Sequence, residues 1–138
     1  MAYRVAMDIG ATRTMIALVH GSRPEVIAHQ RPNSEVLFTG WRPPALALAS
    51  AVQTFLREQQ IDLAEVLGVG VGIPGMVNRH EGLVYACPNL NVLDGAPIGP
   101  ESSKELGVPV YIDNNTNLIA LGEHTAGVGQ GVDHMAFI

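Results

Sequence analysis

The sequence predicts an α/β domain with a mixed central sheet and flanking helices. The chain opens with three short apolar runs joined by tight turns, continues with a helical pattern, and then alternates between strand-forming and helix-forming segments. Its 138 residues, of which 47% are hydrophobic, are enough to bury one core. In sheets of this kind ligands bind beyond the carboxyl ends of the strands, so a functional site is expected there.

The N-terminal segment predicts a three-stranded meander. Strands are expected over Tyr3 to Met7, Thr14 to Val19 and Val26 to Gln30, because each is an apolar run bounded by turn-forming residues. Glycine, serine and proline between the second and third runs have the composition of a turn.

A helix and a glycine-rich strand follow the meander. The helix is expected to begin at Pro43-Pro44 and to end near Gln60, since proline is tolerated in the first turn. Its buried stripe consists of Leu48, Val52, Phe55 and Leu56. The strand is expected over Val66 to Gly72, where glycines alternate with Leu67, Val69 and Val71. One face of this strand is bare, so a helix, another backbone or a ligand should approach it.

The second half of the chain predicts further helix and strand units. A short helix is expected over Glu101 to Leu106 and a buried strand over Val108 to Ile112. The polar cluster Asp113 to Asn117 then opens a helix that stops at Gly127. The apolar side of that helix comes from Leu118, Ile119 and Leu121. A last apolar strand is expected to begin at His134 to Ile138.

The segment Asp8 to Arg13, between the first two strands, has the features of a phosphate-binding hairpin. Asp8 leaves a strand end, where it would hold Mg²⁺ or its water shell, because magnesium binds through one or two carboxylates together with substrate phosphates. Gly10 lets the backbone approach a ligand, and Thr12 offers a hydroxyl to a phosphate oxygen. An ordinary hairpin that uses these residue types is the alternative.

Two more polar turns should meet this hairpin. Ile73 to Gly75 and Asp113 to Asn117 each follow a predicted strand, so three distant turns converge on one edge of the sheet. Gly70 to Gly75 also matches the G-x-G-x-x-G pattern of dinucleotide sites, with Asp94 at the distance of a ribose-binding acid. We reject that site, because Met76 to Gly82 has the composition of a turn and not of the helix the pattern requires.

Composition limits the partners of the chain. A net charge of −5 and a pI near 5.4 give no basic footprint, so no direct binding to nucleic acid or to an anionic membrane is expected. Cys87 is the only cysteine, which excludes an internal disulfide and fits a reducing compartment. The N-terminus reads as a strand and not as an export signal, so a cytoplasmic location is expected.

Four motifs together resemble those of the ROK family of bacterial sugar kinases and sugar-responsive repressors. In chain order they are Asp8 to Arg13, Gly72 to Gly75, Pro88-Asn89-Leu90, and Asp113 to Asn117 running on to Ala120-Leu121-Gly122-Glu123. The Asp-Gly-Thr hairpin also occurs in other actin-like ATPases, but the set is specific and covers nearly the whole chain. The resemblance implies a ribonuclease-H-like (actin-like ATPase) lobe with a mixed central sheet and flanking helices.

ATP and Mg²⁺ are the cofactors that this resemblance implies. Asp8, Gly10 and Thr12 are similar to the family's first phosphate motif, which serves Mg²⁺ and the γ-phosphate of ATP. Asp8 is accordingly the expected metal ligand, acting through the nucleotide.

On the sugar side, the resemblance assigns Gly75, Asn89, Asn114 and Asn115 to substrate binding. An asparagine amide carries both donors and acceptors, so it can satisfy neighbouring sugar hydroxyls. The residues by themselves leave alternatives open, since Asn89 also suits a turn and Asn114 and Asn115 also suit the N-cap of the next helix.

Asn115 departs from the family pattern. Family kinases carry an aspartate at this position, similar to a general base that accepts the proton of the attacking sugar hydroxyl, and an amide cannot act as that base. Losing it would slow phosphoryl transfer by roughly 10²- to 10⁴-fold. Asp113 is a weak substitute, because the family often has an additional acid there.

The expected domain organisation has two parts. Residues 1–122 form an N-terminal ribonuclease-H-like sugar-kinase lobe. Residues 123–138 form the end of a connecting helix, a Gly-rich loop and the first strand of a C-terminal lobe that the chain lacks. The family's second phosphate loop, adenosine pocket and zinc-binding cysteines belong to that lobe, so these residues alone are expected to lack useful kinase activity.

Three functions are compatible with these features. The first is the N-terminal lobe of an ATP-dependent hexose or N-acetylhexosamine kinase, favoured by the Asp8 to Thr12 hairpin. The second is the sugar-binding effector domain of a ROK-type transcriptional repressor, favoured by Asn115. The third, an actin-like or chaperone-like ATPase lobe, leaves the Pro88-Asn89-Leu90 turn unexplained. The expected partners are a sugar and a nucleotide, and an uncovered sheet edge predicts association into a homodimer.

Overall fold

The computed structural model describes all 138 residues and confirms the α/β fold with a mixed sheet. Five strands lie in the order β3-β2-β1-β4-β7. Their bounds are β1 Tyr3–Ile9, β2 Thr14–His20, β3 Val26–Gln30, β4 Val66–Ile73 and β7 Val110–Asn114. The first three strands pair antiparallel, whereas β4 runs parallel to both β1 and β7.

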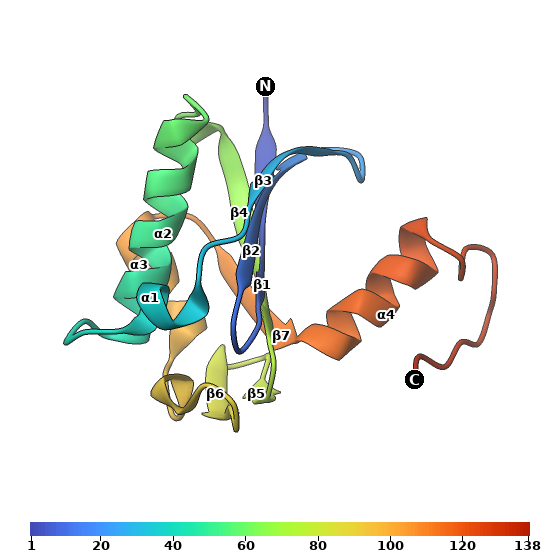
Figure 1. Cartoon of the computed structure of the whole chain (residues 1–138). Coiled ribbons are helices and arrows are strands. Elements are labelled where there is room, and N and C mark those ends of the chain that lie inside the picture. Colours follow the sequence, from blue (N-terminus) through green and yellow to red (C-terminus); the bar gives the residue numbers. More distant parts are fainter.

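The helices are divided between the two faces of this sheet (Figure 1). On one face lie α1 (Ser34–Phe38), α2 (Pro44–Glu58) and α3 (Ile98–Leu106), whereas α4 (Asn115–Ala126) leaves the end of β7 and projects on the other side. A hairpin of β5 (Met76–Asn78) and β6 (Leu83–Ala86) and two 3-10 helices, η1 (Leu63–Glu65) and η2 (Asn91–Leu93), complete the chain. None of the helices combines the length and hydropathy that crossing a bilayer requires.

The core lies between the sheet and α2, and α2 presents the predicted stripe to it. The four stripe residues are each at most 2% exposed: Leu48, Val52, Phe55 and Leu56. They pack in one cluster with the inward residues of β1 and β4, among them Val5, Met7, Val69 and Val71. The helix starts at Pro44 as expected and ends at Glu58, with Gln59 as its C-cap.

The structure corrects the expected place of Leu67 in β4. This side chain is 53% exposed, whereas Val66 beside it is buried. The pairing of β4 with β1 shifts register between Tyr3 and Val5. The extra residue of the bulge places Leu67 on the opposite face of the sheet from Val69. Strict alternation along the sequence cannot reveal such a change.

The first helix, α1, was not expected from the sequence. Its five residues are too few to show a helical period. Asn33 caps it, because its side-chain oxygen accepts a hydrogen bond from the N–H of Val36 at 3.1 Å. Ser34 and Phe38 of this helix are buried.

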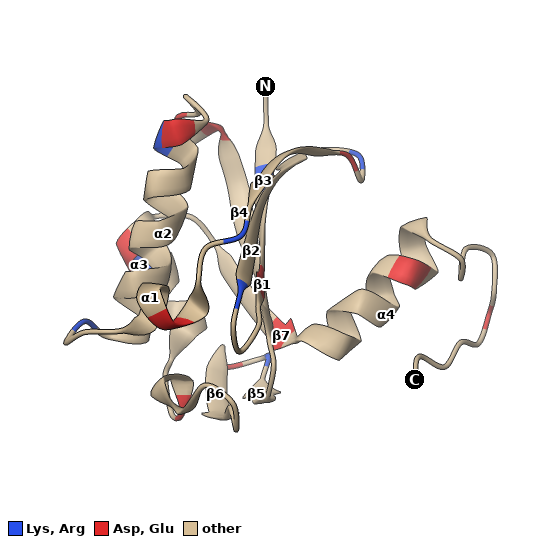
Figure 2. Cartoon of the chain, in the orientation of Figure 1, with Lys and Arg blue, Asp and Glu red and all other residues tan.

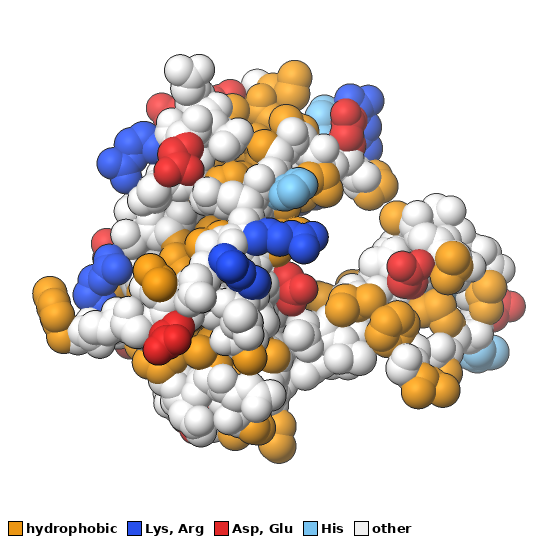
Figure 3. Space-filling view, viewed as in Figure 1, with side chains coloured by type: hydrophobic (Ala, Val, Ile, Leu, Met, Phe, Trp, Pro, Cys, Tyr) orange, Lys and Arg blue, Asp and Glu red, His pale blue; other side chains and the backbone are white.

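The helix α4 begins at the predicted polar cluster and ends at Ala126, with the predicted stop Gly127 as its C-cap, but its apolar side covers no core. Ile119 and Leu121 are 45% and 58% exposed. Figure 3 shows the molecule hollowed between the sheet and α4, with hydrophobic side chains along the helix. The helix is therefore held at its N-terminal end and carries an open apolar surface.

The strand expected at His134–Ile138 is not formed. These residues carry no regular secondary structure, and the sheet contains no strand from this segment. A strand is stable only when a neighbour satisfies its backbone donors and acceptors, and none lies beside this segment.

Replacing Leu48 by alanine should lower the free energy of unfolding by about 2–5 kcal/mol, because it removes a fully buried side chain and leaves a cavity. Leu46→Ala, on the outer side of the same helix and 38% exposed, is the matched control and should cost less than about 1 kcal/mol. Urea unfolding followed by circular dichroism measures both values. Equal costs would contradict this assignment of the buried face.

Candidate functional site

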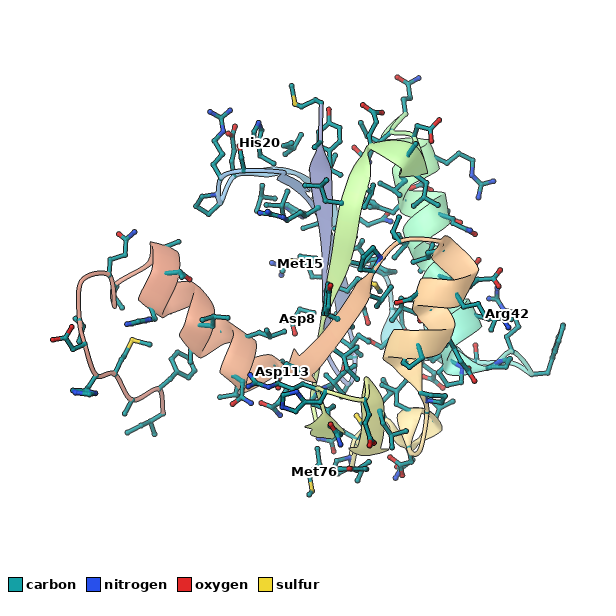
Figure 4. All side chains as sticks on the ribbon, turned by 180° about the vertical axis from the view of Figure 1, so that it is seen from behind. Asp8, Met15, His20, Arg42, Met76 and Asp113 are labelled. Carbon is teal, nitrogen blue, oxygen red and sulfur yellow. The ribbon has the colours of Figure 1, made fainter.

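The candidate site lies where the three parallel strands end. The register pairs Asp8 of β1 with Gly72 of β4, and Gly72 with Asp113 of β7. Residues paired in this way point to the same face, which is the face that α1, α2 and α3 leave uncovered. Figures 2 and 4 show the two acidic positions on β1 and β7 beside the start of α4. The predicted convergence of the polar turns at one edge of the sheet is thereby confirmed.

Asp8 and Asn115 face the same opening. A cavity of about 360 Å³ on the open face is lined by Asp8, Gly72 and Asn115, together with apolar residues of β1 and α4. A Cβ atom placed on Gly72 would lie 3.2 Å from the Cβ of Asn115 and 3.4 Å from Oδ1 of Asp8. The missing side chain at Gly72 therefore leaves the space that joins the two residues.

Asp8 contains an unsatisfied buried oxygen. Its Oδ1 atom is the only buried side-chain nitrogen or oxygen without a hydrogen-bond partner in the chain. Burying an acceptor without a partner costs free energy, because the atom loses its bonds to water. Such an atom at the mouth of a cavity is suited to a cation or a ligand proton.

The turn after Asp8 is closed by the backbone. The N–H of Gly10 donates to the carbonyl of Arg13 at 2.9 Å. A Cβ atom on Gly10 would lie only 2.6 Å from that carbonyl oxygen, so the turn needs glycine for close approach of the backbone. Thr12 is exposed at the tip, and its hydroxyl makes no hydrogen bond within the chain. The hydroxyl is thus available to a ligand, and its binding to a phosphate oxygen stays a prediction.

Asn114 is engaged in holding the structure together. Its Oδ1 accepts hydrogen bonds from the N–H groups of Thr116 (2.9 Å) and Asn117 (3.3 Å), which makes it the N-cap of α4. Its Nδ2 donates to the carbonyl of Gly75 at 2.8 Å. The alternative of an N-cap is confirmed for Asn114, and one amide N–H remains for a ligand. Asn115 is not the cap, and its side chain has no partner in the chain.

Gly75 brings the turn that carries Asn89 into place. A Cβ atom on Gly75 would overlap the carbonyl of Ala86 and lie 2.9 Å from Cα of Cys87. Asp94 secures the same turn, since its Oδ1 accepts a hydrogen bond from the N–H of Cys87 at 2.7 Å. Asn89 is exposed and its side chain forms no hydrogen bond within the chain. Gly75 therefore acts through its backbone, while Asn89 offers a free amide.

The structure around Gly75 supports the rejection of a dinucleotide site. Gly70 to Gly75 forms the end of β4 and a turn into β5, and no helix follows it.

Burial raises the pKa of the Cys87 thiol, and the Asp94 carboxylate raises it further. A buried thiol held protonated in this way is a poor nucleophile.

Asp113 is poorly placed to replace the family's aspartate. Its Oδ1 accepts hydrogen bonds from the N–H of Asn114 at 2.7 Å and from Nδ2 of Asn117 at 3.2 Å, and its Oδ2 lies 3.8 Å from Nη1 of Arg79. It lines two other cavities, of about 450 and 510 Å³, and not the one that Asp8 lines. The carboxylate is thus occupied with protein partners and faces a different space.

The chain is similar to proteins of one family over almost its whole length. Residues 4–138 match the model of the ROK family. A glucokinase from Halalkalibacterium halodurans is 27% identical over 134 residues, which are 97% of this chain and 40% of that protein. A ROK hexokinase from Thermus thermophilus has a TM-score of 0.76 at 27% identity, over 94% of this chain and 40% of that one.

A regulator is as similar as the kinases. A ROK family transcriptional regulator described as a homologue of the E. coli MLC protein has a TM-score of 0.77 at 28% identity, over 95% of this chain and 32% of that one. These likenesses confirm the ribonuclease-H-like (actin-like ATPase) lobe. The chain spans 40% or less of the length of each of these relatives.

Replacing Gly10 by alanine should lower the free energy of unfolding by about 1–3 kcal/mol, because the new methyl group meets the carbonyl of Arg13. Gly70→Ala is the control on the same sheet, since a Cβ there meets nothing within 4 Å and should change stability by less than about 1 kcal/mol. Chemical denaturation of both variants measures the difference. A Gly10 variant as stable as the wild-type protein would show that the turn tolerates a side chain.

Proposed function

Because the chain belongs to the ROK family, we propose that it forms the N-terminal lobe of an ATP-dependent sugar kinase. The reaction is phosphoryl transfer to a hydroxyl of a hexose or an N-acetylhexosamine. Residues 1–122 constitute the lobe, and residues 123–138 lead from it toward a second lobe that completes the cleft. The lobe is proposed to act in the cytoplasm on small molecules.

The observation that carries this proposal is the unpaired Oδ1 of Asp8. A structural role would give this oxygen a donor, whereas a cation-binding role requires it to be free in the unliganded protein. Mg²⁺ fits this donor set, because it takes one or two carboxylates and completes its shell with water and phosphate oxygens. The residues present therefore suit Mg²⁺ held together with ATP.

The chain's own residues have separable roles in this proposal. Asp8 holds the metal, and Thr12 receives a phosphate oxygen through its hydroxyl. Gly10 contributes by letting the turn close, because its own N–H is already bonded to the carbonyl of Arg13. When bound, Mg²⁺-ATP supplies the phosphoryl group and neutralises charge on the phosphates. Across the cavity, Asn115 is close enough to share the opening with Asp8 and free to bind sugar hydroxyls.

Further sugar contacts come from the turn beside Asn115. Asn89 contributes its free amide, and Asn114 contributes the one N–H that its cap and its bond to Gly75 leave over. Gly75 positions the turn and offers backbone only. These groups donate and accept hydrogen bonds without a charge, which suits neutral hydroxyls.

The amide of Asn115 supports a second candidate, the sugar-binding effector domain of a ROK-type transcriptional repressor. Asn115 offers no base for the proton of the attacking hydroxyl, and Asp113 is occupied elsewhere. A sensor needs the sugar contacts but not the base. The likeness to the regulator supports this candidate as much as the likeness to the hexokinase supports a kinase. The unpaired carboxylate of Asp8 decides our preference for the kinase.

Replacing Asp8 by asparagine should weaken the Mg²⁺-dependent binding of ATP to the 138-residue chain by at least about tenfold, since one charged hydrogen-bond or metal contact is worth that much. Asp113→Asn is the matched control at the same edge of the sheet and should change the affinity less than about threefold. Calorimetric titration with ATP, with and without EDTA, measures the effect. If neither EDTA nor the Asp8 substitution changes the affinity for the nucleotide, the proposed metal site is rejected.

Placing an aspartate at position 115 tests whether this position can supply the general base for phosphoryl transfer. In a two-lobed protein that joins this chain to the C-terminal lobe of the H. halodurans glucokinase, Asn115→Asp should raise sugar-dependent ADP release by roughly 10²- to 10⁴-fold, because it supplies a general base. Asn114→Asp, which also adds a carboxylate but keeps the N-cap, should give no such increase. A coupled assay for ADP measures both. No gain at Asn115 would favour the sugar-sensing function.

A further inference from the structure

A chain of two buried hydroxyls lies beneath the hairpin that carries Asp8. Only three polar or charged residues of the protein are buried, namely Thr14, Ser34 and Ser102, and the first two are in contact. Ser34 Oγ donates to the carbonyl of Gly10 at 2.6 Å. Thr14 Oγ1 lies 2.8 Å from Ser34 Oγ. Because Ser34 has given its single proton to Gly10, Thr14 is the donor in that second bond.

The backbone reinforces this contact on both sides. The N–H of Ser34 donates to the carbonyl of Thr12 at 2.9 Å, and the N–H of Thr14 donates to the carbonyl of Pro32 at 3.0 Å. The segment that makes these bonds is the N-terminal end of α1, about 20 residues further along the chain than the turn it holds. The turn from Gly10 to Arg13 is therefore held by α1 as well as by its own backbone.

These bonds determine where the N–H groups of the turn point. All peptide bonds of the chain are trans. In a trans peptide the carbonyl of one residue and the N–H of the next point in opposite directions. Since Ser34 takes the carbonyls of Gly10 and Thr12, the N–H groups of Ala11 and Arg13 face away from α1. Neither of these N–H groups donates a hydrogen bond within the chain.

We propose that Ser34 is a positioning residue that orients the backbone N–H groups of this turn toward the phosphates of a nucleotide. The proposal rests on the proposed function, because it needs the hairpin to bind phosphate. Without the Ser34 hydroxyl, the carbonyl of Gly10 and the hydroxyl of Thr14 would both lose a buried partner. The peptide between Gly10 and Ala11 would then be free to rotate, and the N–H groups would lose their common direction.

The chain contains a matched control for this serine. Ser102 on α3 is equally buried, and its hydroxyl donates to the carbonyl of Ala45 at 3.2 Å. That bond joins α3 to α2, and neither of its residues belongs to the hairpin or to α1. Ser34→Ala and Ser102→Ala thus remove the same kind of group from two different places.

Hydrogen exchange of the unliganded 138-residue chain provides the first test. In Ser34→Ala the amide of Gly10 should exchange at least about tenfold faster, because the turn that holds its bond to Arg13 is loosened. In Ser102→Ala the same amide should change less than about twofold. Equal acceleration in both variants would overturn the proposal, as would no acceleration in Ser34→Ala.

Nucleotide binding provides the second test. The affinity for Mg²⁺-ATP should fall about tenfold in Ser34→Ala and less than about twofold in Ser102→Ala. If the wild-type chain does not bind Mg²⁺-ATP, the two variants are compared in the two-lobed protein that joins it to the C-terminal lobe of the H. halodurans glucokinase, and the proposed function fails if that protein does not bind Mg²⁺-ATP either. The exchange rates decide in each case whether Ser34 holds the turn. Binding that is unchanged in Ser34→Ala, in a wild-type chain that does bind, would overturn the positioning role.

A second variant covers the case in which Ser34→Ala does not fold. Thr14→Val keeps the shape of the side chain and removes the donor to Ser34, while the bond from Ser34 to Gly10 remains. It should accelerate exchange of the Gly10 amide by about threefold and weaken the binding of Mg²⁺-ATP by a similar factor. A variant that matches the wild-type protein in both measurements would overturn the proposal, and Thr14→Ser should restore the wild-type values.

Discussion

The register of the three parallel strands is the constraint on which the candidate site depends. It sets Asp8, Gly72 and Asp113 in one row across the carboxyl edge of the sheet. Two carboxylates two strand spacings apart, roughly 9–10 Å, leave a gap between them because the middle residue has no side chain. The first turn of α4 enters this gap and brings Asn115 against Gly72. A slip of one residue would turn all of these groups into the core.

Two features of the open face of the sheet lower the stability of the fold. One face of the sheet is covered by helices and contains the core, whereas the other presents glycines and an acceptor without a donor. A sequence selected only for stability would fill Gly70, where a Cβ atom meets nothing within 4 Å, and would give the Oδ1 of Asp8 a donor. Departures from local consistency of this kind concentrate at functional sites. The exposed apolar side of α4 borders the same hollow.

The sequence predicted most of the sheet and the meeting of the polar turns, because those depend on local patterns. The apolar runs and the Asp-Gly-Thr turn locate the first strands, and Pro44 and the spacing of Leu48 to Leu56 locate α2. What it missed depends on tertiary contacts. The exposure of Leu67 follows from a bulge against β1, and the five residues of α1 show no period. The strand expected at His134–Ile138 would need a neighbour that the sheet does not supply.

The two candidate functions differ in what they demand of Asp8 and Asn115. Binding a sugar uses neutral donors and acceptors, which Asn115 and Asn89 provide whether or not a phosphoryl group is transferred. Transfer needs in addition a cation site and a place for the hydroxyl proton. The chain has at position 8 a carboxylate that sugar binding alone does not require, and at position 115 an amide where the proposed transfer reaction would use an aspartate. Because an unpaired buried oxygen is costly to keep and an amide at position 115 is not, the carboxylate is the more informative of the two residues. Asp8 therefore supports the proposed nucleotide-binding lobe, and Asn115 predicts that its transfer step is slow.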